Sequence, residues 1–217
     1  MIKAAIFDVD GLLVDTEPLH YLAWKETLKM YGIRFEKKEF MKRFAGIGTS
    51  ATAAYFAKKF RLHEDSLLKG KKEIYFNLIR NVEPMPGAKD VVKRFRKFMP
   101  VAAASSSRIE DVSPVLRKIG VLKLLDAVAT GDEVKKLKPH PDVYLLAAKK
   151  LGMKPKFCVA FEDTSVGVSA AKAAGMFCIA VPNIYTKVQN FSKADMIEKS
   201  LKGINTKKFL IWLETIR

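Results

Sequence analysis

Hydrophobic positions along the chain follow two different periodicities. Short, nearly continuous apolar runs lie at 4–7, 101–104, 127–129, 157–161 and 177–181. Helical spacing of apolar residues instead marks the segments at 88–98, 109–119, 141–151 and 166–174. Because a repeated alternation of buried strands and helices is typical of parallel sheets, this pattern predicts an α/β fold. We expect a doubly wound parallel sheet with helices on both faces.

A long stretch near the beginning of the chain lacks any convincing strand. Four helical patterns follow one another there, at 16–32, 36–44, 49–60 and 65–79, and Pro84, Pro86 and Gly87 mark the return to strand and helix alternation. We therefore expect a Rossmann-like core formed by 1–14 and 84–217, with a four-helix domain inserted at 15–83. The tail at 206–216 is predicted to be an amphipathic helix that packs on the core.

Composition narrows the classes of protein without deciding between them. Hydrophobic residues make up 49% of the 217 residues, which is enough for a sizeable core and argues against disorder. The 39 lysines and arginines exceed the 23 acids and give a net charge of +16, which suits nucleic acid, anionic membranes or phosphorylated substrates. A lysine-coated surface without a specific partner explains it more simply. No arginine-rich motif, zinc-ligand spacing or interleaving of aromatic and basic residues supports nucleic-acid binding.

The cysteines and the longest apolar runs bear on the cellular compartment. Cys158 and Cys178 each lie in an apolar run and form no Cys-x-x-Cys pair, so we expect buried thiols in a reducing compartment. No apolar run fits a signal peptide or reaches membrane-spanning length. The sequence thus predicts a cytoplasmic protein with no membrane partner, as a monomer or weak homodimer.

Two acids stand directly after the first predicted strand. Asp8 and Asp10 are two residues apart, so both can face one ligand from an extended chain, and Gly11 allows a sharp exit. In open α/β sheets, ligands bind at the carboxyl ends of the strands. Alone, however, Asp-x-Asp-Gly is also an ordinary turn sequence.

Three later strand ends carry complementary groups. Ser105 and Ser106 follow the second predicted strand, although serines there are also common helix caps. Lys138 follows the third strand, and neighbouring prolines stiffen its segment, whereas most lysines are solvated charges. Glu162 and Asp163 end the fourth strand. If the strands are parallel, these groups meet at one edge, where carboxylates suit Mg²⁺ and the lysine and serines suit phosphoryl oxygens.

These motifs, in this order along nearly the whole chain, resemble those of the haloacid dehalogenase superfamily. They resemble in particular its β-phosphoglucomutase-like branch of small phosphatases and phosphomutases with a helical cap. The resemblance implies that Asp8 is the nucleophile that forms an aspartyl-phosphate, and that Asp10 is the general acid and base. It further implies that Ser105 binds the phosphoryl group with help from the Ser106 N–H, and that Lys138 balances the negative charge.

The resemblance also implies a cofactor and a mobile cap. Mg²⁺ would be held by Asp8, the backbone carbonyl of Asp10, Glu162 and Asp163. The inserted helical domain would be the cap, with hinges at 14–16 and 82–87.

Four residues of the cap are candidates for substrate binding: Thr16, His20, Thr49 and Lys71. His20 lies four residues after Thr16 on one helix face, and the resemblance pairs it with Lys71, although a structural histidine is the alternative. Thr49 stands where the mutase has an arginine for the second phosphate of its substrate. This departure counts against mutase activity unless Lys42 or Arg43 takes over.

The sequence therefore predicts a Mg²⁺-dependent phosphatase that hydrolyses a small phosphorylated metabolite, a sugar or polyol phosphate. A β-phosphoglucomutase-type phosphomutase is the alternative within the same family. A dehalogenase is disfavoured because such relatives lack the second aspartate of the pair and need no metal. A nucleic-acid-binding protein is the alternative from a different class, and only the net charge supports it.

Overall fold

The computed structural model describes residues 1–45 and 47–204 of the chain. It divides into two compact units. The first, which we call the α/β unit, comprises Met1–Asp15 and the chain from Glu83 onward; the second, the helical unit, comprises Thr16–Val82. The predicted tail helix at 206–216 lies outside the described residues.

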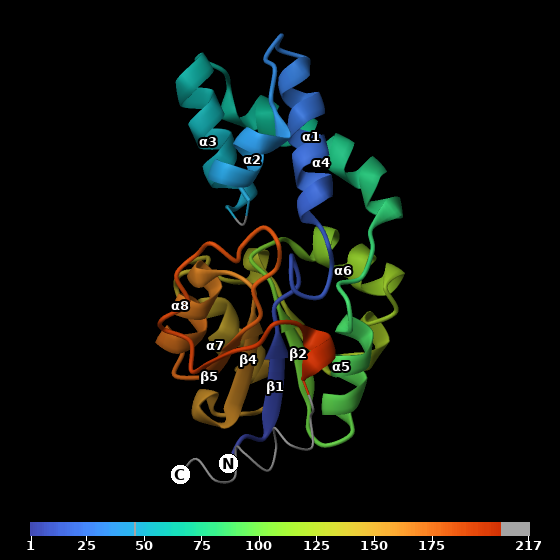
Figure 1. Cartoon of the computed structure of the whole chain (residues 1–217), viewed down its shortest axis with the longest axis vertical. Helices are drawn as coiled ribbons and strands as arrows, with labels where there is room; N and C mark the ends of the chain where they lie inside the picture. The colour runs from blue at the N-terminus through green and yellow to red at the C-terminus, as the bar shows by residue number, and fades with distance from the viewer. Residues whose placement is uncertain (46, 205–217) are drawn as a thin grey trace. The chain divides into compact units, whose positions relative to one another are not determined.

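The α/β unit is built on one parallel sheet. Its strands are β1 (Ala4–Phe7), β2 (Val101–Ala104), β3 (Ala127–Ala129), β4 (Cys158–Glu162), β5 (Phe177–Ala180) and β6 (Met196–Ile197). They lie in the order β3-β2-β1-β4-β5-β6, and every neighbouring pair is parallel. Figure 1 shows β1 between β2 and β4. The predicted α/β class is confirmed; only β6 was missed, because two residues make no recognisable apolar run.

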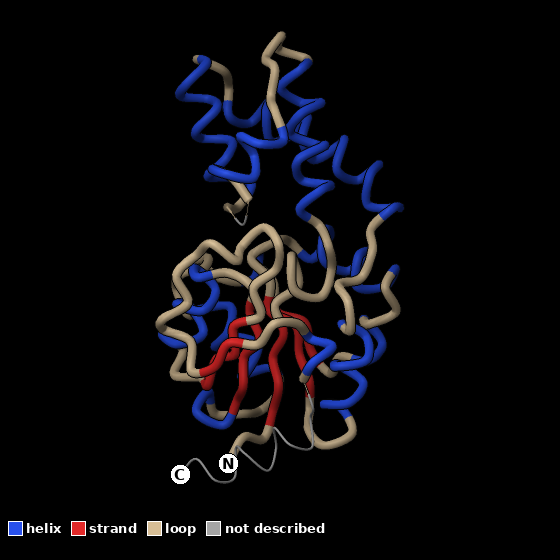
Figure 2. The backbone as a smooth tube through the Cα atoms, in the orientation of Figure 1, coloured by secondary structure: helices blue, strands red, loops and turns tan. Residues whose placement is uncertain are grey.

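Helices cover both faces of this sheet, as Figure 2 shows. They are α5 (Ala88–Arg96), α6 (Ile109–Lys118), α7 (Asp142–Lys150) and α8 (Ser165–Ala173). Alternate residues of β1 point to opposite faces: Ile6 packs in a cluster with residues of α7 and α8, whereas Phe7 meets Phe95 of α5 with ring centroids 5.8 Å apart. Since both faces are buried, all four residues of β1 are apolar and fully buried.

Short 3₁₀ turns complete the connections of the α/β unit, at Leu122–Leu124, Gly131–Glu133, Pro155–Phe157 and Leu201–Gly203. Cys158 and Cys178 are both buried free thiols, as the sequence predicts. Helix α5 ends two residues before its predicted end at 98, because the chain turns there: the N–H of Phe98 and that of Met99 both donate to the carbonyl of Phe95.

The helical unit has a core of its own. Its helices are α1 (Glu17–Lys29), α2 (Lys37–Arg43), α3 (Thr49–Phe60) and α4 (Glu64–Leu78), followed by a 3₁₀ turn at Ile79–Asn81. Aromatic residues fill the interior, where Phe35 makes edge-to-face contacts with Phe40, Phe44 and Phe56. Such pairs contribute about 0.5–1.5 kcal/mol each beyond the burial of their area.

Two segments of the α/β unit lead towards the helical unit and are hydrogen-bonded to each other. The N–H of Asp15 donates to the carbonyl of Glu83 at 2.9 Å, and that of Met85 donates to Leu13 at 3.0 Å. Asp15, Glu83 and Met85 lie within the predicted hinges, whose motion stays a prediction. Among the residues that the structure describes, no helix is long and apolar enough to cross a membrane.

Candidate active site

The predicted catalytic groups of the α/β unit stand at the carboxyl ends of its strands. Asp8 and Asp10 follow β1, Ser105 follows β2, and Glu162 is the last residue of β4. Register explains the arrangement: Phe7 of β1 is opposite Ala103 of β2 and Phe161 of β4, so these three strands end at the same level. The backbone pairing itself therefore delivers the acids and the serine to one edge of the sheet.

Lys138 lies at the centre of this edge. Its Nζ donates to Asp8 Oδ1, to Glu162 Oε1 at 2.6 Å and to the backbone carbonyl of Ala104 at 3.1 Å. An ammonium group has three hydrogens, so these acceptors from three different strand ends use them all. The side chain is only 7% exposed, and the Lys138–Pro139 peptide bond is cis. Lys138 thus ties the ends of β1, β2 and β4 together.

Glu162 is fixed by several donors besides Lys138. The hydroxyl of Tyr144, on α7, donates to Oε1 at 2.6 Å, and the hydroxyl of Thr164 donates to Oε2 at 3.2 Å. Gly167 faces this carboxylate so closely that a Cβ atom there would overlap it. A glycine at this position in the first turn of α8 (Ser165–Ala173) is therefore needed for Glu162 to stay buried. Sequence reasoning missed Tyr144, whose only signal is a hydroxyl in the apolar stripe of a helix.

Buried negative charge dominates the electrostatics of the site. Burial raises the pKa of Asp8 to about 8, with Glu162 and Asp10 acting in the same direction and Lys138 opposing them. Burial disfavours the charged form of Lys138, but Asp8 and Glu162 outweigh it and hold the pKa of the ammonium above its ordinary value. A further positive charge beside Asp8 would favour its ionised form.

Asp10 faces the serines that follow β2. Its Oδ2 accepts from Ser105 Oγ at 3.1 Å and from Ser107 Oγ at 3.0 Å, and the Ser107 N–H donates to Ser105 Oγ at 3.0 Å. Ser107 was not among the predicted site residues, although it belongs to the same run of hydroxyls. The backbone of Ser106 packs against Gly131, where a Cβ atom would overlap the Ser106 carbonyl.

Three carboxylates form a cluster that can hold a metal ion. Asp8, Glu162 and Asp163 are all buried, and each offers an oxygen within 4.8 Å of the others. Oxygen ligands of this kind suit Mg²⁺. Asp10 is the fourth residue predicted to bind the metal. Its carboxylate accepts hydrogen bonds from Ser105 and Ser107, so its backbone carbonyl is the group left to bind the metal, as predicted. The donor set therefore fits a hard divalent cation.

Three candidate residues of the helical unit, His20, Thr49 and Lys71, lie together in one cluster with Tyr75. The His20 ring stacks on Tyr75 with centroids 4.7 Å apart, and Lys71 Nζ lies 4.1 Å from the centroid of the same ring. Lys71 also donates to Thr49 Oγ1 at 3.2 Å. Desolvation, followed by the charge of Lys71, lowers the pKa of His20 well below its ordinary value. Thr16 is buried just before α1, and its carbonyl accepts from the His20 N–H.

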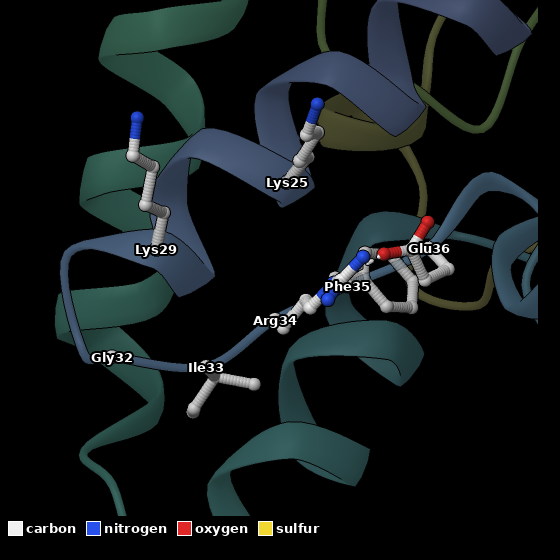
Figure 3. Close-up of a pocket in the computed structure, with 7 residues that line it drawn as sticks. All are labelled: Lys25, Lys29, Gly32, Ile33, Arg34, Phe35 and Glu36. Atoms are coloured by element: carbon white, nitrogen blue, oxygen red, sulfur yellow. Dashed lines mark hydrogen bonds and ion pairs between the residues drawn. The ribbon is translucent and has the colours of Figure 1, made fainter.

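A pocket in the helical unit offers no comparable chemistry. Figure 3 shows it at the turn between α1 and α2, where Lys25 and Lys29 project from α1. Its single acid, Glu36, pairs with Arg34 at 2.6 Å. No predicted catalytic or substrate-binding residue lines this pocket, so the acid cluster remains the candidate active site.

Comparison with known proteins identifies the family of the chain. Residues 5–181 match the haloacid dehalogenase-like hydrolase family. The fructose-1-phosphate phosphatase YqaB of Escherichia coli K12 is 37% identical over 179 residues, which cover 81% of this chain and 94% of that protein. The β-phosphoglucomutase of Bacillus subtilis is 31% identical, with 82% and 83% covered.

A solved structure extends the similarity to the fold. The crystal structure of CbbY from Rhodobacter sphaeroides in complex with phosphate is 30% identical, covers 94% of this chain and 97% of that chain, and superposes with a TM-score of 0.83. The order of acids, serine and lysine along the parallel sheet and the match over residues 5–181 lead to one conclusion: the chain belongs to the haloacid dehalogenase-like hydrolase family.

Proposed function

We propose that the protein is a Mg²⁺-dependent phosphatase that hydrolyses a small phosphorylated metabolite, a sugar or polyol phosphate. Membership of the family, with phosphatases and a phosphomutase of sugar phosphates among the relatives, supports an enzyme acting on phosphoric monoesters. The observation that carries the proposal is the buried cluster of Asp8, Glu162 and Asp163, in which Asp8 and Glu162 pair with Lys138. Such a site can attract an anionic phosphoryl group only if a cation offsets its acids.

The first chemical step is attack by Asp8. One carboxylate oxygen of Asp8 forms a bond to phosphorus as the bond to the leaving oxygen breaks, which gives an aspartyl-phosphate. Lys138, which contacts Asp8, stabilises the negative charge on the transferring group. Ser105 donates to that group once its single hydroxyl hydrogen turns away from Asp10 Oδ2, where Ser107 still donates. Asp10 gives a proton to the leaving oxygen.

The second step reverses the role of Asp10. The carboxylate, now ionised, takes a proton from water as the water attacks phosphorus, and Asp8 is released with free phosphate. The hydrogen bond from Ser107 supports this role because it orients the Asp10 carboxylate while Ser105 faces the phosphoryl group.

Mg²⁺ fits the donor set of the site. Asp8, Glu162 and Asp163 would hold it, with the backbone carbonyl of Asp10. When bound, the ion supplies positive charge that offsets the acids and the phosphoryl oxygens. It also favours the ionised form of Asp8 that the nucleophilic role requires.

A β-phosphoglucomutase-type phosphomutase is the second candidate. The arrangement of His20, Tyr75 and Lys71 favours it, since the family resemblance pairs a histidine with a cap lysine. Thr49 opposes it, because a hydroxyl that accepts from Lys71 replaces the arginine of the mutase. If water accepts the phosphoryl group in the second step, the protein needs no binding site for a second phosphate of the substrate. We therefore favour hydrolysis over the mutase reaction.

A panel of phosphate esters separates these candidates. The purified protein is incubated with Mg²⁺ and sugar and polyol phosphates, and free phosphate and glucose 6-phosphate are assayed in the same samples. Release of free phosphate that stops with EDTA supports the phosphatase. Conversion of β-glucose 1-phosphate to glucose 6-phosphate without free phosphate supports the mutase, and activity unchanged by EDTA would refute the metal assignment.

A further inference from the structure

Asn183 forms hydrogen bonds with two segments of the candidate active site, although it was not among the predicted site residues. It lies in the loop after β5 and is 9% exposed. Its Nδ2 donates to Asp163 Oδ2 at 2.9 Å and to the backbone carbonyl of Gly11 at 2.9 Å. Asp163 follows β4, and Gly11 follows Asp10 after β1. One amide thus bridges the two acidic segments that frame the carboxylate cluster.

The orientation of this amide is fixed by its other contacts. Asn183 Oδ1 accepts from the N–H of Tyr185 at 2.8 Å and from that of Thr186 at 3.1 Å. Backbone N–H groups only donate, and the carbonyl of Gly11 only accepts, so exchanging the amide oxygen and nitrogen would break all of these bonds. The turn at 183–186 therefore presents the NH₂ group, and no other, to Asp163.

Fixing one oxygen of Asp163 sets the direction of the whole carboxylate, because the group is planar and rigid. Gly11, whose φ is +81°, packs closely against this Asp163 oxygen. A Cβ atom at Gly11 would overlap Asp163 Oδ2 and lie 3.0 Å from Asn183 Nδ2. The Asp163 carboxylate is thus held between the Gly11 backbone and the Asn183 amide. The distance of the Asp163 carboxylate from those of Asp8 and Glu162 therefore depends on the Gly11 backbone and on the Asn183 amide.

We propose that Asn183 is a positioning residue that holds Asp163 and the backbone after Asp10 in the geometry that binds the divalent cation. The inference rests on the proposed function, since it needs the cluster of Asp8, Glu162 and Asp163 to be a metal site. Residues that orient metal ligands through hydrogen bonds commonly change metal affinity by about 10–100-fold when they are removed. Asn183 acts through Asp163 rather than on the substrate.

The test compares two asparagines of the same loop. Asn183→Ser keeps a hydroxyl that can accept from the backbone N–H groups of the turn but is too short to reach Asp163. Asn190→Ser is the matched control, because Asn190 is exposed and its Oδ1 accepts from the Ser192 N–H in a similar turn. Asn183→Thr, which fills more of the buried space, replaces the serine variant if that variant does not fold.

Two quantities are measured in each folded variant. Isothermal titration calorimetry without substrate gives the dissociation constant of Mg²⁺, and steady-state assays give the Mg²⁺ activation constant beside the substrate KM. For Asn183→Ser we expect Mg²⁺ binding weaker by about 10–100-fold, with a substrate KM at saturating Mg²⁺ that changes much less. Asn190→Ser should match the wild type in both.

The outcomes separate this inference from the proposed function. Wild-type Mg²⁺ affinity in a folded Asn183 variant, even one with a lower melting temperature, would overturn the positioning role and leave the phosphatase proposal intact. An equal loss of affinity in Asn190→Ser would also overturn it. A wild-type protein that releases phosphate but binds no Mg²⁺ would remove the metal site and this inference together.

Discussion

The acid site of the α/β unit and the His20 cluster of the helical unit are built by different means. In the α/β unit, strand register brings Asp8, Ser105 and Glu162 to one edge. There Lys138 donates to Asp8, to Glu162 and to the backbone carbonyl of Ala104. In the helical unit, His20 and Lys71 meet on the ring of Tyr75, between two helices of an aromatic-rich bundle. The positions of the candidate catalytic residues thus depend on the order and register of the strands. The positions of the candidate substrate-binding residues depend on how side chains pack between helices.

This difference predicts unequal consequences of substitution. Changes at the sheet edge should affect catalysis or stability strongly, because the charged side chains of Asp8, Lys138 and Glu162 are buried there. Changes in the helical cluster should alter substrate preference with small effects on the chemical steps. The following variants test this contrast from the largest expected effect to the smallest.

Asp8→Asn should abolish turnover, with a rate loss of at least about 10⁴-fold, since an amide oxygen is a poor nucleophile. Phosphate release from the best substrate of the panel measures it. The melting temperature serves as a control for folding. A rate near that of the wild type would show that another group attacks phosphorus.

Lys138→Met should destabilise the protein by about 3–5 kcal/mol, because it leaves the buried acids Asp8 and Glu162 without their ammonium partner. Urea unfolding measures the change in the free energy of unfolding, and Lys135→Met, at an exposed lysine of the same segment, is the matched control. Added Mg²⁺ should restore part of the stability. Equal stability of the two variants would contradict the central role of Lys138.

Asp10→Asn should slow the reaction by roughly 100-fold or more, the usual size of general acid and base help. The serines should still donate to the amide oxygen, so the fold should be kept. Steady-state rates with a poor and a good leaving group measure the effect, and the loss should be greater for the poor one. An equal loss for both would argue against proton donation by Asp10.

Thr49→Val should have the smallest effect, since it removes one hydrogen bond from Lys71 in the helical unit. One such bond is worth about 0.5–1.5 kcal/mol, so KM for the preferred metabolite should change by about 2–10-fold with kcat little altered. Comparison of KM and kcat across the ester panel measures this. A loss of kcat as large as that of Asp10→Asn would contradict the proposed difference between the acid site of the α/β unit and the His20 cluster of the helical unit.

The parts of the site that the sequence predicts are those that strand ends determine. Asp8, Asp10, Ser105 and Glu162 directly follow or end apolar runs, and parallel strands place such residues at one edge whatever the details of packing. The same reasoning predicts the sheet, apart from β6. Family resemblance then adds the expected roles, which stay proposals.

The parts that the sequence does not reveal depend on distant packing. Tyr144 reaches Glu162 from α7, and Asn183 reaches Gly11 across 172 positions of the chain. Their neighbours in sequence give no sign of these contacts, because a tyrosine in an apolar helix face and an asparagine in a turn are both ordinary. Tyr75, which joins His20 and Lys71, was hidden for the same reason.

The central claim is that Asp8 carries the phosphoryl group during turnover. Rapid acid quenching of the wild-type protein with Mg²⁺ and its best substrate, followed by mass spectrometry of the peptides, tests it most directly. The account predicts a phosphoryl group on Asp8 that appears in the first turnover and decays as free phosphate forms. A phosphoryl group on another residue, or none during active turnover, would contradict it.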